Sequence, residues 1–364
     1  MRILFLTHDS LDYVSDPLYV GLSRVLGHEQ VVDYPYKRSF HDPEARLWCL
    51  AQRPGRRCSR EEIVDLLRGR AFDLVCLASF RRESIDECAW LYGQVPFPPM
   101  VFVDGEDGAN LRHDVVRRFP LAAYFKREYV WTGKTQGGRF LDCVRSFHFD
   151  KALYAKTHPF PMSVDLTTVP QQDVTGRDVD VSFYGHASHR KRLKAMGVLE
   201  SLDAEGLRVS GDIYGSATDR KYKLQKSLVG RLMTKLFDSS YVSEADVKRR
   251  LSPQDHYRIL ARSKVALAVR GGGFDTYRYW EIVACKALLL AEMPDIVIPH
   301  NFEHGRHAVF CRPDLGDLKE LVRYYSRHDK ERETIAAEGY AHLLKYHTCE
   351  RRAEYFLDVC AKSI

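Results

Sequence analysis

The chain has 364 residues, enough for two domains of about 170 residues each. Hydrophobic residues make up 45% and charged residues 29%, a balance that excludes disordered, fibrous and membrane-spanning proteins. The opening apolar run is too short for a signal peptide, and no segment reaches the roughly 18 apolar residues of a membrane span, so we expect a cytoplasmic protein. Six basic residues and one acidic residue between 219 and 237 carry most of the net charge of +6, so the basicity belongs to one segment.

The first half of the sequence alternates apolar runs with helical patterns. A helix is expected over 17–26, and Ser59 with Glu62 predicts the capping box of another. Near-continuous apolar strands separated by helices are typical of a parallel sheet covered on both faces. We therefore predict a Rossmann-like α/β domain over 1–160. Its strands are expected at 2–7, 30–34, 72–78, 99–104 and 122–125.

The stretch 157–178 contains three prolines and no apolar period, which predicts a linker between domains. After it the alternation of strands and helices begins again, so we predict a second Rossmann-like domain over 175–347, followed by a helix over 348–364. Helices are expected from Arg190, over 276–286 and from 315 onward. Strands are expected at 180–184, 207–214, 264–269, 287–291 and 309–311.

The strand at 264–269 runs into Arg270 and three consecutive glycines, 271–273, and the next helix carries Arg278 and Glu281. Such glycines let a phosphate or sugar approach bare backbone N–H groups, and the N-terminus of the following helix attracts a negative ligand. Arg278 offers a fork for phosphate oxygens, and Glu281 can accept hydrogen bonds from ribose hydroxyls. The alternative is a tight turn with an ion pair between Arg278 and Glu281 inside the helix. The pattern indicates a nucleoside diphosphate site.

This element also resembles a known family. Residues 278–288, which read RYWEIVACKAL, look like the R-x-[FW]-E-x-x-A-C-G-A element of GT-B glycosyltransferases, especially the group-1-like C-terminal domain of CgeB-type spore-maturation proteins. Residues 302–305 are similar to that family's f-x-x-G element, and the likeness extends to Arg352. The resemblance implies two domains facing across a cleft, a nucleotide-sugar donor on the second domain, an acceptor on the first, and a final helix that crosses back. It also implies a reaction without a metal or a separate cofactor.

Two residues depart from the family pattern. Lys286 stands where the family has a small glycine, and Gly273 stands where the first glutamate of an E-x7-E pattern would fall. These departures keep a second hypothesis open, a non-catalytic sugar- or polymer-binding protein on a degenerate GT-B scaffold.

Gly185 and Arg190 follow the strand at 180–184 and are expected on the opposite wall of the donor cleft. There Arg190 would neutralise the diphosphate leaving group as its charge develops. The alternative is a glycine turn with a solvated basic helix start. The predicted donor-binding residues are Gly185, Arg190, Arg270, Gly271, Gly272, Gly273, Arg278 and Glu281.

Asp104 ends an apolar strand and so lies at the carboxyl edge, where α/β sheets place their ligands. An inverting transferase needs a carboxylate or histidine there to deprotonate the acceptor hydroxyl. Asp104 is the first candidate for that role and His8, after the first strand, is the second; ordinary turn chemistry is the alternative for each. Residues 126–128 are candidates for the same cleft.

Two groups of histidines, at 186 and 189 and at 300, 304 and 307, lack carboxylate or cysteine partners at ligand spacing, so we expect no metal site. The basic segment 220–237 has leucines at 224, 228, 232 and 236, which predicts an amphipathic helix. Such a helix can lie on an anionic membrane, track nucleic-acid phosphate, or simply pack its leucines on the second domain. A glycosyltransferase that acts on nucleic acid is therefore a third hypothesis.

Overall fold

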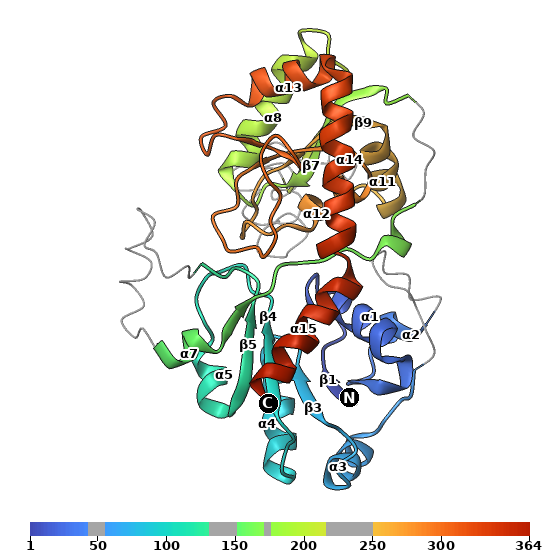
Figure 1. The fold of residues 1–364 in the computed structure, drawn as a ribbon, viewed down its shortest axis with the longest axis vertical. Helices are drawn as coiled ribbons and strands as arrows, with labels where there is room; N and C mark the ends of the chain where they lie inside the picture. Colours follow the sequence, from blue (N-terminus) through green and yellow to red (C-terminus); the bar gives the residue numbers. More distant parts are fainter. Residues whose placement is uncertain (43–54, 131–150, 171–175, 216–249) are drawn as a thin grey trace, which may run out of the picture.

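The computed structural model describes residues 1–42, 55–130, 151–170, 176–215 and 250–364. Two lobes lie one above the other, and both ends of the chain lie in the lower lobe (Figure 1). The lower lobe contains the first half of the chain and the upper lobe most of the second. The basic segment 220–237 lies outside the described residues, so the three alternatives for it stay predictions.

Six parallel strands form the sheet of the N-terminal domain, in the order β2-β1-β3-β4-β5-β6. They are β1 (Ile3–Leu6), β2 (Val31–Tyr34), β3 (Leu74–Leu77), β4 (Met100–Asp104), β5 (Leu121–Lys126) and β6 (Thr157–Pro159). The described helices of this domain are α1 (Ser15–Leu26), α2 (Arg38–His41), α3 (Arg60–Arg68), α4 (Arg82–Gln94), α5 (His113–Arg118) and α7 (Lys151–Ala155).

Strand β6 corrects the predicted linker, which starts later than the sequence indicates. Tyr124 of β5 pairs with Thr157, so the first three residues of the expected linker form an edge strand. Proline is tolerated at an edge because one side of the strand makes no ladder hydrogen bonds. The prolines at 159 and 161 therefore mark the end of the sheet.

Five parallel strands form the second sheet, in the order β11-β10-β9-β7-β8. They are β7 (Val179–His186), β8 (Val209–Tyr214), β9 (Ser263–Ala268), β10 (Leu288–Glu292) and β11 (Val309–Cys311). Counted along the chain, the first five strands of each domain share one spatial order: second, first, third, fourth, fifth. The strand order therefore reverses at β1/β3 in one domain and at β7/β9 in the other.

Both faces of each sheet are buried, as the continuous apolar runs predict. In β1, Ile3 and Phe5 join one hydrophobic core while Leu4 and Leu6 join another. In the C-terminal sheet, α8 (Arg190–Asp203) and α13 (Leu318–Arg327) cover one face. The opposite face packs on α11 (Pro253–Arg262), α12 (Tyr277–Ala284) and α14 (Asp329–Tyr346). The prediction of two Rossmann-like domains is confirmed.

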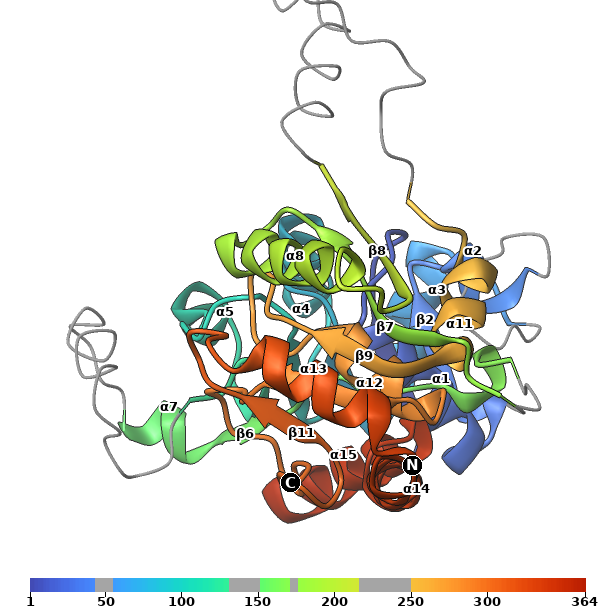
Figure 2. The same ribbon diagram turned by 90° about the horizontal axis from the view of Figure 1, so that it is seen from above.

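The last two helices connect the lobes. Helix α14 runs along the upper lobe and is seen end-on in Figure 2, and α15 (Cys349–Ser363) continues into the lower lobe. There α15 packs against α1 and β5, with the rings of Phe356 and Phe125 4.7 Å apart. One hydrophobic core includes these residues and Trp280 of the upper lobe, so the two domains share apolar packing.

The structure also addresses three smaller points, on a helix cap, the cysteines and membrane spans. The Ser59 hydroxyl accepts the N–H of Glu62 (3.2 Å), and the Glu62 carboxylate accepts the N–H of Ser59 (2.8 Å), which confirms the capping box. All cysteines in the described ranges are free thiols. Within those ranges no helix combines the length and the apolar character needed to cross a bilayer.

Candidate functional site

A cavity of about 650 Å³ lies between the two domains. Its walls come from segments that follow strands, among them Tyr13 and Asp107 of the N-terminal domain and Gly271 of the C-terminal domain. The rings of Tyr13 and Tyr277 meet across it at 5.5 Å. In the C-terminal sheet the cavity lies at the β7/β9 reversal, where doubly wound sheets bind ligands. Its volume suits a ligand of nucleotide size.

The three glycines after β9 bring their backbone against charged side chains. A Cβ on Gly271 would lie 2.8 Å from Nη2 of Arg192, one on Gly272 2.3 Å from Oδ2 of Asp107, and one on Gly273 2.4 Å from Oε1 of Glu128. The sequence predicts close approach of a ligand to this loop. The structure shows that protein groups approach it as well, two of them from the opposite domain.

Arg278 lines the cavity from α12. Its guanidinium lies 5.7 Å from the ring centroid of Phe183, and burial lowers its pKa. Its Nε is buried without a hydrogen-bond partner, and none of the ion pairs among the described residues includes Arg278. Arg278 and Glu281 thus make no direct ion pair, although the negative charge of Glu281 opposes the lowering of the Arg278 pKa. Since its Nε has no hydrogen-bond partner among the described residues, the guanidinium is suited to phosphate oxygens.

Glu281 lies one turn further along α12 and is 3% exposed. Its Oε2 lies 3.2 Å from Nε2 of His256, a residue of α11 that also lines the cavity. Its Oε1 is buried and has no partner within the described part of the chain. This lone acceptor in a polar cavity is suited to a ligand hydroxyl. Sequence reasoning missed His256, because nothing near α12 in the sequence points to α11.

The basic side chain beside Gly185 is Arg192 rather than Arg190. Arg190 begins α8 and is exposed, whereas Arg192 is buried and lines the cavity. Two positions along an α-helix differ by about 200°, so only one of the two residues can face inward. Nε of Arg192 donates to the carbonyls of Val269 (3.2 Å) and Arg270 (3.0 Å), and burial lowers its pKa to about 10.

Arg270 shapes the glycine loop rather than lining the cavity. Its guanidinium stacks 4.0 Å from the ring centroid of Phe274 and donates to the carbonyl of Gly272 (3.3 Å). Its backbone N–H donates to Oε1 of Glu292 (2.8 Å), which also pairs with Lys191. Glu292 thus anchors the beginning of the loop.

Asp104 ends β4 but is fully buried. Lys126 donates to its Oδ2 (2.9 Å), the Tyr124 hydroxyl donates to the same oxygen, and the N–H of Glu106 donates to Oδ1 (3.0 Å). Asp104 is not among the described residues that line the cavity. Its role as a base stays a prediction, which this saturated hydrogen bonding does not favour.

His8 follows β1 and is 9% exposed. Burial, followed by the charge of Lys37, lowers its pKa to about 4, so the imidazole is neutral at pH 7. Neither ring nitrogen has a hydrogen-bond partner in the part of the chain that the structure describes. A neutral imidazole with a free lone pair has the chemistry of a general base.

The three side chains of residues 126–128 point to different surroundings. Lys126 is buried against Asp104, and Arg127 lines the cavity, where it pairs with Asp107. The Glu128 carboxylate instead reaches the other domain and accepts the N–H groups of Phe274 (3.0 Å) and Asp275 (2.8 Å).

Lys286 has a left-handed backbone with φ 56° directly after the end of α12. Glycine suits this conformation best, which explains why the family pattern has glycine at this position. The lysine keeps the conformation, and its ammonium lies 4.8 Å from the ring centroid of Tyr340. This departure therefore leaves the local fold intact.

The histidines of the loop at 300–307 make hydrogen bonds and ring contacts within the protein. Nδ1 of His304 accepts the N–H of Phe310 (3.0 Å), and the rings of His307 and His342 stack at 4.1 Å. Among the described residues, no three His, Cys, Asp or Glu side chains are arranged to hold a metal.

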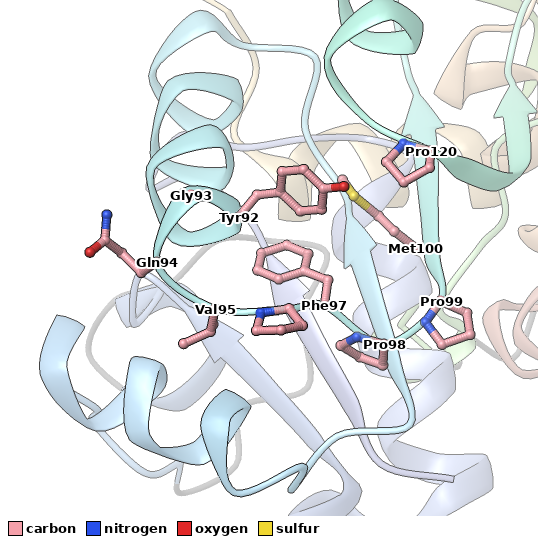
Figure 3. Close-up of a pocket in the computed structure, with 10 residues that line it drawn as sticks. Tyr92, Gly93, Gln94, Val95, Phe97, Pro98, Pro99, Met100 and Pro120 are labelled. Carbon is pink, nitrogen blue, oxygen red and sulfur yellow. The ribbon is translucent and has the colours of Figure 1, made fainter.

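A second cavity of about 600 Å³ lies in the N-terminal domain at the amino end of its strands, around the start of β4 (Figure 3). None of its described lining residues is charged; they are Tyr92, Gly93, Gln94, Val95, Pro96, Phe97, Pro98, Pro99, Met100 and Pro120. Without a cation it is unsuited to a diphosphate, and the interdomain cavity is the better candidate site.

Two Rossmann-like domains facing each other across such a cavity define the GT-B fold. A sequence profile of the family described as glycosyl transferase-like matches residues 198–358, which include α11, α12 and the glycine loop. No curated protein sequence matches the chain. The profile and the fold together support a glycosyltransferase.

Several solved structures have this fold. HepE from Anabaena, in complex with UDP and glucose, is 11% identical, with a TM-score of 0.59 and 99% of both chains covered. A glycosyltransferase from Rickettsia africae is 9% identical, with a TM-score of 0.61 and 100% and 98% covered. The α,α-trehalose 6-phosphate synthase of Burkholderia multivorans is 14% identical, with a TM-score of 0.53 and 100% and 97% covered. At these identities the likeness is one of fold.

Proposed function

We propose that the protein is a glycosyltransferase that takes a sugar from a nucleotide-sugar donor without a metal ion, and that it belongs to the CgeB-type group. One observation carries the proposal: in a single cavity, Nε of Arg278 and Oε1 of Glu281, both on α12, are buried without a hydrogen-bond partner among the described residues. Arg278 and Arg192 would hold the diphosphate, and Oε1 of Glu281 would accept a ribose hydroxyl. The acceptor would enter along the N-terminal wall.

The cations also assist the chemistry. When the bond to the sugar breaks, negative charge grows on the diphosphate, and preorganised guanidinium groups stabilise that charge. On the acceptor side His8 is the better candidate for a base, because its ring nitrogens have no partner among the described residues whereas the oxygens of Asp104 are taken; neither side chain is among the described lining residues of the cavity.

A thermal-shift panel of UDP, GDP, ADP, CMP and dTDP tests the donor site, with UDP first because HepE was solved with UDP. We expect one nucleotide to raise the melting temperature of the wild type and to have no such effect on Glu281→Ala. Arg190→Ala, an exposed residue outside the cavity, is the control and should respond like the wild type. If no nucleotide shifts the wild type, the proposal is wrong.

A further inference from the structure

The segment after β5 connects the N-terminal domain to the donor loop. Glu128 is 3% exposed, and its carboxylate accepts two backbone N–H groups of the other domain, from Phe274 and Asp275. The carbonyl of the next residue, Tyr129, accepts the N–H of Val297 (2.7 Å). Two consecutive residues of the first domain thus bind the backbone of the second.

The Glu128 carboxylate occupies the space in which a side chain on residue 273 would begin. A Cβ there would lie 2.4 Å from Oε1 of Glu128, closer than real Cβ contacts come. Residue 273 is the position at which the E-x7-E pattern would place a glutamate, and this sequence has glycine. The structure therefore has one carboxylate at this place, supplied by the opposite domain.

The two N–H groups depend on this carboxylate. They lie in the turn before α12, where a buried N–H without a partner is costly. The charged neighbours of Glu128 are Arg127, whose Nε lies 3.8 Å away, and Asp275, which accepts the N–H groups of Met162 (2.6 Å) and of the Trp280 indole (2.8 Å). The end of the glycine loop is thus held by groups of both domains.

We infer that Glu128 is a positioning residue for the proposed transfer, through which the N-terminal domain sets the shape of the donor loop. The inference rests on the proposed function. Arg278 and Glu281 bind the nucleotide within the C-terminal domain, while the sugar end of the donor meets a loop that is correctly shaped only when the two domains are in contact.

A reciprocal exchange of the carboxylate tests this inference. Glu128→Ala should lower kcat for UDP release from UDP-glucose about 100-fold, since small misplacements at a reacting centre cost that much. Its UDP thermal shift should stay, because Arg278 and Glu281 are untouched. Gly273→Glu alone should also be impaired, since two carboxylates would compete for one space. The double variant, Glu128→Ala with Gly273→Glu, should recover at least about tenfold over Glu128→Ala. Gly273 has no positive φ, so its backbone accepts a side chain.

Asp33→Ala is the matched control, because Asp33 is also a buried carboxylate that accepts a backbone N–H, from Lys37 (2.7 Å). It should lower stability while kcat of the folded protein stays unchanged. The inference is overturned if Glu128→Ala keeps kcat within about threefold of the wild type, or if the double variant recovers nothing.

Hydrogen exchange of residues 271–276 separates this inference from the proposed function. Glu128→Ala should speed exchange of the Phe274 and Asp275 amides, and the double variant should slow it again, whether or not UDP-glucose is a substrate. If the wild type neither binds UDP nor releases it from UDP-glucose, hydrogen exchange still tests whether Glu128 shapes the donor loop. Unchanged exchange of the Phe274 and Asp275 amides in Glu128→Ala overturns the inference.

Discussion

The two walls of the interdomain cavity differ in how their charges are satisfied. On the C-terminal wall, Nε of Arg278 and Oε1 of Glu281 are buried without a hydrogen-bond partner among the described residues. On the N-terminal side, Asp107 lines the cavity and pairs with Arg127, and the nearby carboxylates of Asp104 and Glu128, which are not among the described lining residues, are also bound by protein groups. A buried polar group without a partner costs about 1–3 kcal/mol, so a ligand that supplies the missing hydrogen bond in the cavity would bind favourably there. Substitutions on the first wall should therefore cost binding, and substitutions on the second should cost stability.

The largest effect is expected for Lys126→Ala, in the buried ion pair behind the carboxyl end of β4 in the N-terminal domain. This change leaves the Asp104 carboxylate buried without its cation, and breaking such a pair costs about 3–5 kcal/mol. Urea unfolding measures the loss, and nucleotide affinity below the transition should be unchanged. Lys156→Ala, an exposed lysine of the same domain, should cost less than about 0.5 kcal/mol. A loss below about 1 kcal/mol in Lys126→Ala would contradict the comparison.

His8 tests the N-terminal domain by pH, and unlike the carboxylates there its ring nitrogens have no hydrogen-bond partner among the described residues. Its folded pKa of about 4 lies below the ordinary 6.5, so the unfolded chain binds the proton more tightly. The free energy of unfolding should therefore fall as pH is lowered from about 6.5 to about 4, by at most about 3 kcal/mol from this residue. His8→Gln should remove that part of the slope, which urea unfolding at several pH values would show. Equal slopes in both proteins would rule the contribution out.

On the unsatisfied wall, Arg278→Ala should weaken nucleotide binding by about 2 kcal/mol, roughly 30-fold in Kd. Stability should stay the same or rise, because burial of the Arg278 charge, which lowers its pKa, outweighs the opposing charge of Glu281. Titration calorimetry and urea unfolding measure the two quantities. Arg190→Ala should change neither. Loss of stability without loss of affinity would reverse the roles assigned to the walls.

The smallest effect is expected outside both walls, at Lys286. Glycine would relieve the left-handed backbone but lose the contact with Tyr340, so Lys286→Gly should stabilise by about 0.5 kcal/mol. Lys286→Ala keeps the strained backbone and loses the contact, so it should destabilise. Thermal unfolding of both variants checks the sign, and equal shifts would contradict the backbone argument.

Features that depend on consecutive residues, such as strands and short motifs, are predicted well from the sequence. The central strands β1 and β3 are continuous apolar runs, and the glycines, Arg278 and Glu281 lie within one short segment. The sequence predicts poorly what depends on helix phase or sheet order. Arg192 faces the cavity and Arg190 does not because of the direction in which α8 begins, and His256 meets Glu281 only because α11 and α12 cover the same face of the sheet. The contact of Glu128 with residue 273 depends on how the two domains meet, which no local pattern contains.

Because helix α15 is synthesised last but packs on the N-terminal domain, that domain cannot complete its core until the whole chain has been translated. Phe356 and Cys360 of this helix are fully buried in the core of the N-terminal domain, beside Phe125 and residues of α1. During translation the first domain emerges long before the residues that cover one face of its sheet. A nascent chain that has reached residue 160 therefore still exposes apolar surface to solvent or to chaperones, and that surface is covered only when residues 349–363 have left the ribosome.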